Sequence, residues 1–582
     1  MAKQTMKVDS TAEAYLAVLA DRGVEYLFGN AGTDFASVIE ALSKSVAQGT
    51  PSPTPVTVPH ENVAMAMAHG YYLVTGRPQA VMVHVTVGTA NAVCGLMNAA
   101  RENIPIIFTA GRTPLNEDGR LGSRSLYIHW GQEMFDQAGM VRELVKWDYE
   151  LRGAMQVETV VDRAMTIAMS EPRGPVYLTL PREVLAENPG TFTYDSPARR
   201  QPAQPTAPDP NAIDRAAAMI AAAEKPVLIT ASYGRDASAV PALAALVERY
   251  AIPVIAYRPR YVCLPTSHPM HMGYESSAFI KDADVIVVLD CDVPWIPSLH
   301  PVNPAAKVIH LGADPLFADY PIRGFPCDLA ITGSSHNAVK ALDGAMATHA
   351  KGATARIETR RAALAKRRDG ILTQRRAARE AAAKSTPIDL PWVAHCIDTV
   401  KGADDIVVSE SQIPLAFMEF DSPGTFFGTS PAGGLGWGTG AALGAQLGAP
   451  DRRVFSIIGD GAYMFGNPTP AHYVGAANDL PVLTVILNNK MWGSVRKATL
   501  GIHPDGVAAR INRAPLTFLE PAPAYHKIVE ACGGYGEEVT APEALPGALQ
   551  RALKVVTDEK RQAVLNVHTA YDDAAAAADA KR

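Results

Sequence analysis

The sequence predicts an α/β protein built from three consecutive doubly wound parallel-sheet domains, at residues 1–185, 205–345 and 385–575. Short apolar stretches, each followed by a glycine-bearing turn or a helical segment, recur in all three regions, as is typical of parallel α/β units. Two of these stretches, 454–458 and 482–487, are joined by about twenty residues, and a crossover of that kind makes its strands parallel. The length of 582 residues also fits three or four domains.

The composition is that of an ordinary globular chain and excludes several classes of protein. Hydrophobic residues make up 48% and charged residues 19% of the chain, and the net charge of −6 is too small to indicate a nucleic-acid partner. No run of eighteen apolar residues indicates a membrane span, and the first ten residues lack the apolar core of a signal peptide. The six cysteines are scattered without a Cys-x-x-Cys pair, which fits a reducing compartment. We therefore predict a cytoplasmic protein.

Three polar residues follow predicted strands in the N-terminal region. Thr33 lies in the glycine-bearing turn 28–34, Glu61 follows the strand at 55–58, and His84 lies near the end of the strand at 80–85. Each has a structural explanation: an N-cap for Thr33, a favourable acid in the first helical turn for Glu61, and a hydrogen-bonded core residue for His84. A carboxylate at the carboxyl end of a parallel strand is also well placed for catalysis.

The middle of the chain predicts connecting segments around a second α/β domain. Residues 186–210 contain six prolines and predict an extended linker. Strands are predicted near 226–230, 253–256, 284–289 and 307–311. The run 351–384 is rich in Ala, Arg, Lys and Glu and predicts a solvated connecting helix, with an RNA-binding arm as the alternative. The Ala-rich tail from Ala574 predicts a frayed or helical surface segment.

The stretch 459–489 predicts a binding site for a diphosphate and a magnesium ion. Asp460 and Asn489 each follow an apolar strand, so we expect both side chains at one edge of the sheet. Carboxylate and amide oxygens suit Mg²⁺, which completes its shell with phosphate and water. Gly459 and Gly461 would allow backbone N–H groups to approach an anion at the start of the next helix. A tight turn followed by an Asn-rich strand end is the alternative.

The motifs at 459–461 and 488–489 resemble the thiamine diphosphate (ThDP) signature of 2-oxo acid decarboxylases and acetohydroxyacid synthases, and the whole chain is most similar to benzoylformate decarboxylases. The resemblance implies that Asp460, Asn489 and the backbone carbonyl of Met491 bind Mg²⁺, and that Glu61 hydrogen-bonds the aminopyrimidine ring of ThDP. It implies further cofactor contacts at Gln412, Gly433, Leu435, Gly459, Gly461 and Ala462. A helix is expected from about Thr469, because prolines interrupt the segment before it.

The same resemblance implies catalytic roles in the N-terminal domain. The segment around His84 is similar to the strand–His–helix segment of the decarboxylases, in which the histidine donates protons, and acetohydroxyacid synthases usually lack it. Thr33 occupies the place of a serine that contacts the substrate carboxylate. At 291–295 the chain departs from the flavin-binding segment of the synthases, so FAD is not expected. His129 and Gln132, in a predicted solvated loop at 112–136, and His300 are left without assigned roles.

The implied function is ThDP- and Mg²⁺-dependent decarboxylation of a 2-oxo acid to an aldehyde, with or without carboligation to an aldehyde acceptor. An acetolactate synthase-like carboligase is the alternative, and a non-catalytic ThDP-binding protein is a third interpretation. In the family, the glutamate half and the Mg²⁺ half of each active site come from different subunits. The resemblance therefore implies a homodimer or homotetramer with active sites at the subunit interface.

Overall fold

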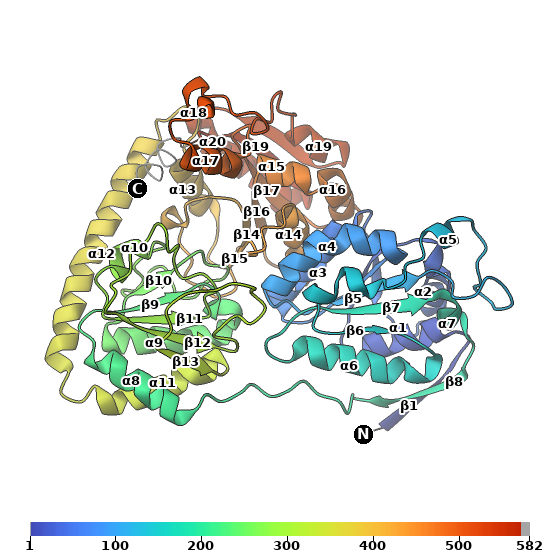
Figure 1. Cartoon of the computed structure of the whole chain (residues 1–582). Coiled ribbons are helices and arrows are strands. Elements are labelled where there is room, and N and C mark those ends of the chain that lie inside the picture. The colour runs from blue at the N-terminus through green and yellow to red at the C-terminus, as the bar shows by residue number, and fades with distance from the viewer. Residues whose placement is uncertain (1, 572–582) are drawn as a thin grey trace.

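The structure is a computed structural model of the chain and describes residues 2–571. Three lobes surround a central junction, and each carries one parallel sheet, which confirms the predicted fold class (Figure 1). The N-terminal and C-terminal lobes each contain a six-stranded sheet, and the central lobe contains a five-stranded sheet. The tail from Ala574, for which a surface segment was predicted, lies outside the described residues.

The N-terminal lobe has the strand order β3-β2-β4-β5-β7-β6. Its strands are β2 (Tyr26–Asn30), β3 (Thr54–Thr57), β4 (Ala80–Val83), β5 (Ile107–Arg112), β6 (Asp148–Glu150) and β7 (Val176–Pro181). Its helices are α1 (Thr11–Asp21), α2 (Ala36–Gln48), α3 (Glu61–Thr75), α4 (Val85–Arg101), α5 (Ile128–Gly131), α6 (Val157–Met169) and α7 (Arg182–Ala186). Helices α1, α2 and α6 bury one face of the sheet, and α3 and α4 bury the other. The chain order reverses between β2 and β4, and such a switch point is where open α/β sheets bind ligands.

The predicted linker is corrected by the structure in its first part. Strand β8 (Gly190–Ser196) pairs antiparallel with β1 (Ala2–Val8), and Met6 lies opposite Phe192. Most side chains of this ribbon are exposed or half-buried, so neither strand shows the apolar alternation from which a strand is predicted. The two strands tie the beginning of the chain to the end of the N-terminal lobe.

The central lobe has the strand order β10-β9-β11-β12-β13. Its strands are β9 (Pro226–Thr230), β10 (Val254–Ala256), β11 (Val285–Leu289), β12 (Lys307–Gly312) and β13 (Leu329–Thr332). Its helices are α8 (Pro210–Ala222), α9 (Val240–Tyr250), α10 (Ser277–Ile280) and α11 (Ser335–His349). The four predicted strands are present, and β13 is an addition: this edge strand alternates buried and exposed residues over only four positions.

The long helix α12 (Thr354–Ala382) confirms the helix predicted from the basic run, but it is more than a solvated connector. It runs along the outside of the molecule from the central lobe to the C-terminal lobe (Figure 1). Arg360 donates to the carbonyls of Tyr250 and Ala251 at the end of α9, and Arg368 donates to the carbonyl of His271. These guanidinium groups satisfy carbonyls that a helix end or a loop leaves without backbone partners.

The C-terminal lobe has the strand order β15-β14-β16-β17-β19-β18. Its strands are β14 (Ile406–Glu410), β15 (Phe426–Gly428), β16 (Val454–Gly459), β17 (Val482–Asn488), β18 (Tyr535–Val539) and β19 (Ala563–His568). Its helices are α13 (Leu390–Val400), α14 (Trp437–Gly448), α15 (Asp460–Phe465), α16 (Pro468–Ala477), α17 (Gly493–Ile502), α18 (Val507–Ile511), α19 (His526–Ala531) and α20 (Leu545–Lys554). Pro468 and Pro470 lie in the first turn of α16, where a missing N–H is tolerated.

The N-terminal and C-terminal lobes share one buried apolar cluster, to which α3 and α4 contribute from one lobe and α14 from the other. Within it, the His69 ring meets the Trp437 ring edge-on with centroids 5.3 Å apart. The two lobes of one chain therefore form a packed interface rather than independent units.

Among residues 2–571, no helix has both the length and the apolar composition needed to cross a bilayer.

Candidate active site

The N-terminal sheet brings three candidate residues to its switch point. Asn30 ends β2, Glu61 begins the helix after β3, and His84 follows β4 directly. Strands β3, β2 and β4 are neighbours and parallel, so their carboxyl ends meet at one edge of the sheet. Glu61 contributes to the electrostatic environment of His84, which places the two side chains in the same part of the lobe.

Glu61 is held by two asparagine side chains that the sequence interpretation did not single out. The carboxylate is 8% exposed, and its Oε1 accepts an N–H from Asn30 Nδ2 at 2.9 Å. The other oxygen, Oε2, accepts an N–H from Asn91 Nδ2 on α4. Both hydrogen bonds orient the carboxyl group and offset part of the cost of its burial. They fix the direction in which Glu61 can meet a ligand.

His84 is paired with a buried carboxylate. Its Nδ1 lies 2.5 Å from Oδ1 of Asp34, which is 3% exposed. The Asp34 carboxylate raises the pKa of His84 above its usual value, although partial burial of the ring opposes this. On the other edge of the ring, Nε2 lies 3.1 Å from Nε2 of Gln132. The loop that carries Gln132 therefore reaches the candidate site, whereas the sequence predicted a solvated loop.

Thr33 and His129 lie close to this region in the chain. Thr33 is exposed, and no side-chain cap bond is formed at the start of α2 or of the short helix Thr33–Phe35 that precedes it, so the N-cap explanation does not hold. His129 is only 2% exposed, and its Nδ1 accepts the backbone N–H of Ser125. Burial lowers the pKa of His129, as do the charges of Arg182 and Arg124. His129 is thus an internal support of the loop.

The C-terminal sheet has its own switch point, between β14 and β16, and Asp460 lies there. Gly459 at the end of β16 is in register with Leu487 of β17, so Asp460 and Asn489 follow adjacent strand ends, as expected. Asp460 is 2% exposed, and burial raises its pKa to about 6 against the effect of surrounding backbone N–H groups that include those of Gly461 and Met491. The turn at Asn489 is closed by the Met491 N–H, which donates to Asn489 Oδ1 at 3.1 Å.

The residues at this switch point fit a divalent cation and a diphosphate. Oδ1 of Asp460 accepts the Gly461 N–H at 3.0 Å, whereas its Oδ2 is buried and has no hydrogen-bond partner among the described residues. A buried carboxylate oxygen without a partner is costly, and a cation would satisfy it. No described atom lies within 4 Å of the position a Cβ would take on Gly459. This leaves space for a ligand beside the start of α15, the helix that includes Ala462. Within residues 2–571, no group of three or more His, Cys, Asp or Glu could hold a metal, so amide and carbonyl oxygens would have to complete the shell.

The glycine-rich turn before α14 is clamped from both lobes. Gly433 and Gly436 have φ of +65° and +84°, and Glu410 at the end of β14 accepts the Gly436 N–H at 2.8 Å. From the N-terminal lobe, Asn98 donates to the Gly434 carbonyl at 2.8 Å and accepts the Gly434 N–H at 3.0 Å. We did not predict this pair, since nothing local in the sequence marks an α4 asparagine as the partner of a turn more than 300 residues away.

Two further contacts belong to this turn and its neighbourhood. Asn62, which follows Glu61, donates to the Leu435 carbonyl at 3.5 Å, and His60, which precedes it, lies 3.0 Å from the Asn467 side chain. Gln412 donates to the Ser494 hydroxyl at 2.8 Å, which joins the end of β14 to α17. In one chain, the start of α3 therefore already lies beside the C-terminal lobe.

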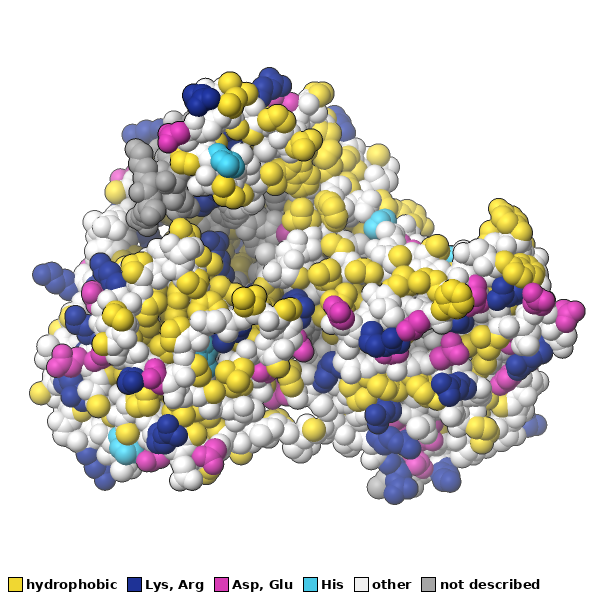
Figure 2. All heavy atoms as spheres, in the orientation of Figure 1, with side chains coloured by type: hydrophobic (Ala, Val, Ile, Leu, Met, Phe, Trp, Pro, Cys, Tyr) yellow, Lys and Arg dark blue, Asp and Glu magenta, His cyan; other side chains and the backbone are white. Residues whose placement is uncertain are grey.

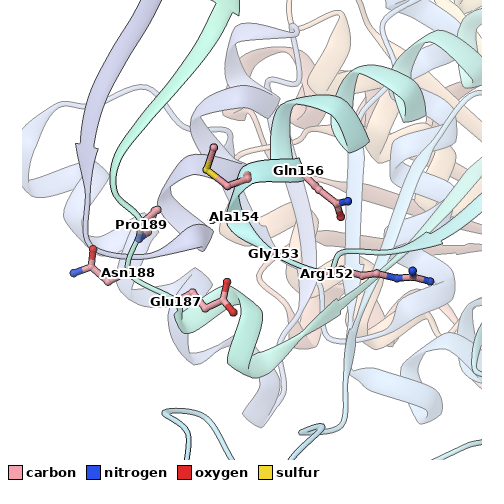
Figure 3. A pocket seen from close by; sticks show the side chains of 8 residues that line it. Arg152, Gly153, Ala154, Gln156, Glu187, Asn188 and Pro189 are labelled. Atoms are coloured by element: carbon pink, nitrogen blue, oxygen red, sulfur yellow. The ribbon is translucent and has the colours of Figure 1, made fainter.

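Two described hollows lie away from these residues. A cavity of about 560 Å³ lies at the switch point of the central sheet and is lined by Arg235, Asp290 and Ser334, together with Arg101 and Glu171 of the N-terminal lobe. A shallower hollow of about 520 Å³, between α7 and the start of α6, presents the side chains of Arg152, Gln156, Glu187 and Asn188 (Figure 3). No candidate catalytic or cofactor residue lines either of them.

His300 is held within the central lobe. Its Nδ1 accepts the Ile296 N–H at 3.0 Å, and its ring meets Tyr257 edge-on. This arrangement assigns it a local structural role.

Comparison with known proteins identifies three regions of the chain. Residues 9–140 match the N-terminal TPP binding domain of thiamine pyrophosphate enzymes, residues 213–342 match the central domain, and residues 409–567 match the C-terminal TPP binding domain. The chain is similar to benzoylformate decarboxylase of Pseudomonas aeruginosa, with 27% identity over 92% of this chain and 95% of that protein. It is also similar to the acetolactate synthase isozyme 3 large subunit of Escherichia coli, with 25% identity over 95% of this chain and 94% of that protein.

Solved structures show the same fold. The ThDP-dependent 4-hydroxybenzoylformate decarboxylase of Rhodococcus jostii RHA1 has a TM-score of 0.76 and 23% identity, over 97% of this chain and all of that one (100%). Benzoylformate decarboxylase of Polynucleobacter necessarius has a TM-score of 0.78 and 20% identity, over 97% and 99% of the two chains.

Proposed function

Because this chain belongs to the thiamine pyrophosphate enzymes, we propose that it catalyses the non-oxidative decarboxylation of a 2-oxo acid to an aldehyde, with ThDP and Mg²⁺. The observation that carries the proposal is His84, which lies at the switch point of the N-terminal lobe near Glu61 with a raised pKa. Releasing CO₂ from a 2-oxo acid anion to give an aldehyde consumes one proton. A histidine held in its charged form beside the reacting atoms can supply it.

The proposed cofactor site uses residues of both TPP binding domains. Asp460, Asn489 and the Met491 carbonyl would hold Mg²⁺, and the N–H groups at the start of α15 would hold the diphosphate. Bound ThDP would supply a thiazolium ring that takes up the electrons released with CO₂. Glu61 would hydrogen-bond the aminopyrimidine ring, with its direction set by Asn30 and Asn91.

The remaining candidate residues would complete the site. The Gly433 carbonyl would meet the ring on its other side, and Leu435 would support its bent shape. Gln412 would lie near the diphosphate. Thr33, which is exposed at the same edge of the N-terminal sheet, would contact the substrate carboxylate.

A panel of 2-oxo acids tests this function. Purified protein with ThDP and Mg²⁺ is offered aliphatic and aromatic 2-oxo acids, and CO₂ release and products are measured with and without an aldehyde acceptor. We expect CO₂ and the matching aldehyde from at least one acid, and a fall in turnover of two or more orders of magnitude in Glu61→Gln, in line with the loss of an acid–base group. Near-normal turnover in that variant would contradict the role of Glu61.

An acetolactate synthase-like carboligase is the second candidate, because the similarity to the E. coli synthase subunit covers 95% of this chain. The same panel separates the two activities. A carboligase would give acetolactate from pyruvate with little free acetaldehyde, whereas the proposed decarboxylase releases aldehyde. A yellow, flavin-bearing protein would also favour the synthase interpretation.

We further propose that each active site combines Glu61 of one subunit with Asp460 of another. Hydrophobic side chains exposed on the loop around α5, among them Leu121, Tyr127 and Phe135, provide surface for such a contact (Figure 2). Mixing Glu61→Gln and Asp460→Asn chains tests the arrangement. A hybrid dimer regains one intact site only if the two residues come from different chains, so activity that stays absent in the hybrid would place both residues of a site in one chain.

A further inference from the structure

We infer that Asp34 and Gln132 form a relay with His84, in which Asp34 keeps the imidazole doubly protonated and Gln132 holds its Nε2–H until that proton is given to the substrate. This inference rests on the proposed function and names Asp34 as a positioning residue, not as a group that touches substrate. The contacts are short and specific: Asp34 Oδ1 meets His84 Nδ1 at 2.5 Å, and the Asp34 side chain is 3% exposed.

The backbone around the pair is shaped to hold it. A Cβ on Gly111 of β5 would lie 1.6 Å from Asp34 Oδ2, and a Cβ on Gly32 would lie 2.1 Å from His84 Nδ1. Any side chain at either position would push the partners apart. The close contact of carboxylate and imidazole therefore depends on two glycines, one in β5 and one in the turn after β2.

Strain at the next residue supports the same conclusion. Val85 has φ of +30°, a conformation that a β-branched residue rarely adopts. Its N–H donates to Asp34 Oδ2 at 3.3 Å, so the same carboxylate binds both the imidazole and the strained backbone. Strain of this kind persists where the surrounding structure enforces it, and it is concentrated at functional sites.

Gln132 completes the relay from the other side of the ring. The Thr86 hydroxyl, in the first turn of α4, donates to the Gln132 carbonyl at 2.9 Å and anchors the loop over His84. Gln132 Nε2 faces His84 Nε2 at 3.1 Å, while Gln132 Oε1 is buried and has no partner among the described residues. Turned by 180°, the amide presents Oε1 to the imidazole and accepts the Nε2–H of the charged ring. With the amide in this orientation, the doubly protonated ring donates to both Asp34 and Gln132.

The proton balance follows directly. His84 gives its Nε2 proton to the carbon that CO₂ has left, and the Nδ1–H remains donated to Asp34. The neutral ring is then reprotonated by water, so one proton enters for each CO₂ released. The titratable groups that face His84 are Asp34, Glu61 and His129, and of these Asp34 makes the direct contact.

The test measures the protonation of His84 apart from catalysis. Diethylpyrocarbonate modifies only neutral imidazole, and tandem mass spectrometry of the peptide that carries His84 gives the extent of modification at each pH. The midpoint of the plot of His84 modification against pH is expected at least about one pH unit lower in Asp34→Asn than in wild type. The reason is that the ion pair is lost while the side-chain shape is kept. Gln132→Leu is expected to lower it less, and Asp451→Asn, which changes an exposed acid in the C-terminal lobe, is the control.

Activity supplies the second readout. In Asp34→Asn the alkaline limb of the pH profile for kcat should shift to lower pH by as much as the midpoint of His84 modification does. At pH 7.5, kcat should fall about tenfold or more. An unchanged midpoint in folded Asp34→Asn overturns the inference, and so does an unchanged midpoint in Gln132→Leu if Asp34→Asn does not fold. If wild type decarboxylates no 2-oxo acid, the proposed function fails together with the proton-donor role, while the midpoints still decide whether the pair exists.

Discussion

Replacing Asn98 by leucine is expected to weaken ThDP binding, although Asn98 has no assigned contact with the cofactor. Asn98 is 1% exposed and makes two hydrogen bonds to the Gly434 peptide, at 2.8 and 3.0 Å. This peptide lies between Gly433 and Leu435, which are proposed to contact the cofactor. Leucine keeps the branched shape of the asparagine side chain, is somewhat larger, and offers neither a donor nor an acceptor.

The size of the effect follows from the two groups left without partners. A buried N–H or carbonyl without a hydrogen bond costs about 1–3 kcal/mol, so the two together cost roughly 2–6 kcal/mol. Part of this free energy weakens the contact between the lobes. The rest is the cost of ordering the Gly434 turn again when the cofactor binds. Since 1.4 kcal/mol corresponds to a factor of ten, we expect the ThDP concentration at half-saturation to rise about tenfold or more. Asn98→Ala should show a smaller change, because the vacated space admits a water molecule.

The assay is titration of the apoprotein with ThDP at fixed Mg²⁺, followed by activity and by tryptophan fluorescence, with a thermal melt to confirm folding. Asn478→Ala is the matched control, because that amide makes one bond, to the Val474 carbonyl at the end of α16, away from the turn. A folded Asn98→Leu variant whose half-saturation stays within twofold of wild type would refute the reasoning. It would show that Glu410 alone fixes the turn.

Three further outcomes can be checked. Arg360→Met should lower the free energy of unfolding by about 2 kcal/mol in chemical denaturation, since two short bonds to helix-end carbonyls are lost, whereas Arg376→Met, exposed on the same helix, should change it little. Burial raises the pKa of Glu102 from 4.5 to about 7, so its ionisation destabilises the fold increasingly as pH rises from about 4.5 to about 7. Glu102→Gln should therefore raise the melting temperature more at pH 8 than at pH 5. A larger rise at pH 5 would contradict this. Asp460→Asn should abolish the stabilisation of the protein by Mg²⁺ with ThDP in thermal melts, and a variant stabilised as much as wild type would exclude Asp460 as the ligand.

Asp460 and Asn489 share one property from which their place in the fold was predicted: each directly follows an apolar strand. Asp460 and Asn489 were expected side by side because parallel strands bring their carboxyl ends to one edge, and the register of β16 with β17 confirms that the strand ends are adjacent. The strands themselves were predictable because their apolar runs end at glycines and polar turns. The ribbon β1–β8 was missed because few of its side chains are buried, and β13 because its alternation spans only four residues.

The supporting residues could not be predicted, because their meaning depends on partners elsewhere in the chain. Asp34 lies in the turn 28–34 and Asn91 in the helix after His84, but neither segment indicates which side chain the polar residue will meet. Gln132 reaches His84 through a loop with no periodicity, and loop conformation is not encoded by an apolar pattern. The arginines of α12 belong to the same class, since their acceptors are backbone carbonyls, which every residue carries.

The contact between the lobes gives the N-terminal lobe two separate functions in the proposed assembly. Through Asn98 it holds the Gly434 turn of its own chain, and that turn would belong to the cofactor site proposed for its own C-terminal lobe. Through Glu61 it would serve the cofactor held by the other subunit. Each N-terminal lobe would then contact two cofactor sites, one through a backbone turn and one through a carboxylate. Because α3 and α4 are packed in the same apolar cluster as α14, a movement that loosens one contact also displaces the other. The two active sites of a dimer are therefore expected to be mechanically linked through the helices of a single lobe.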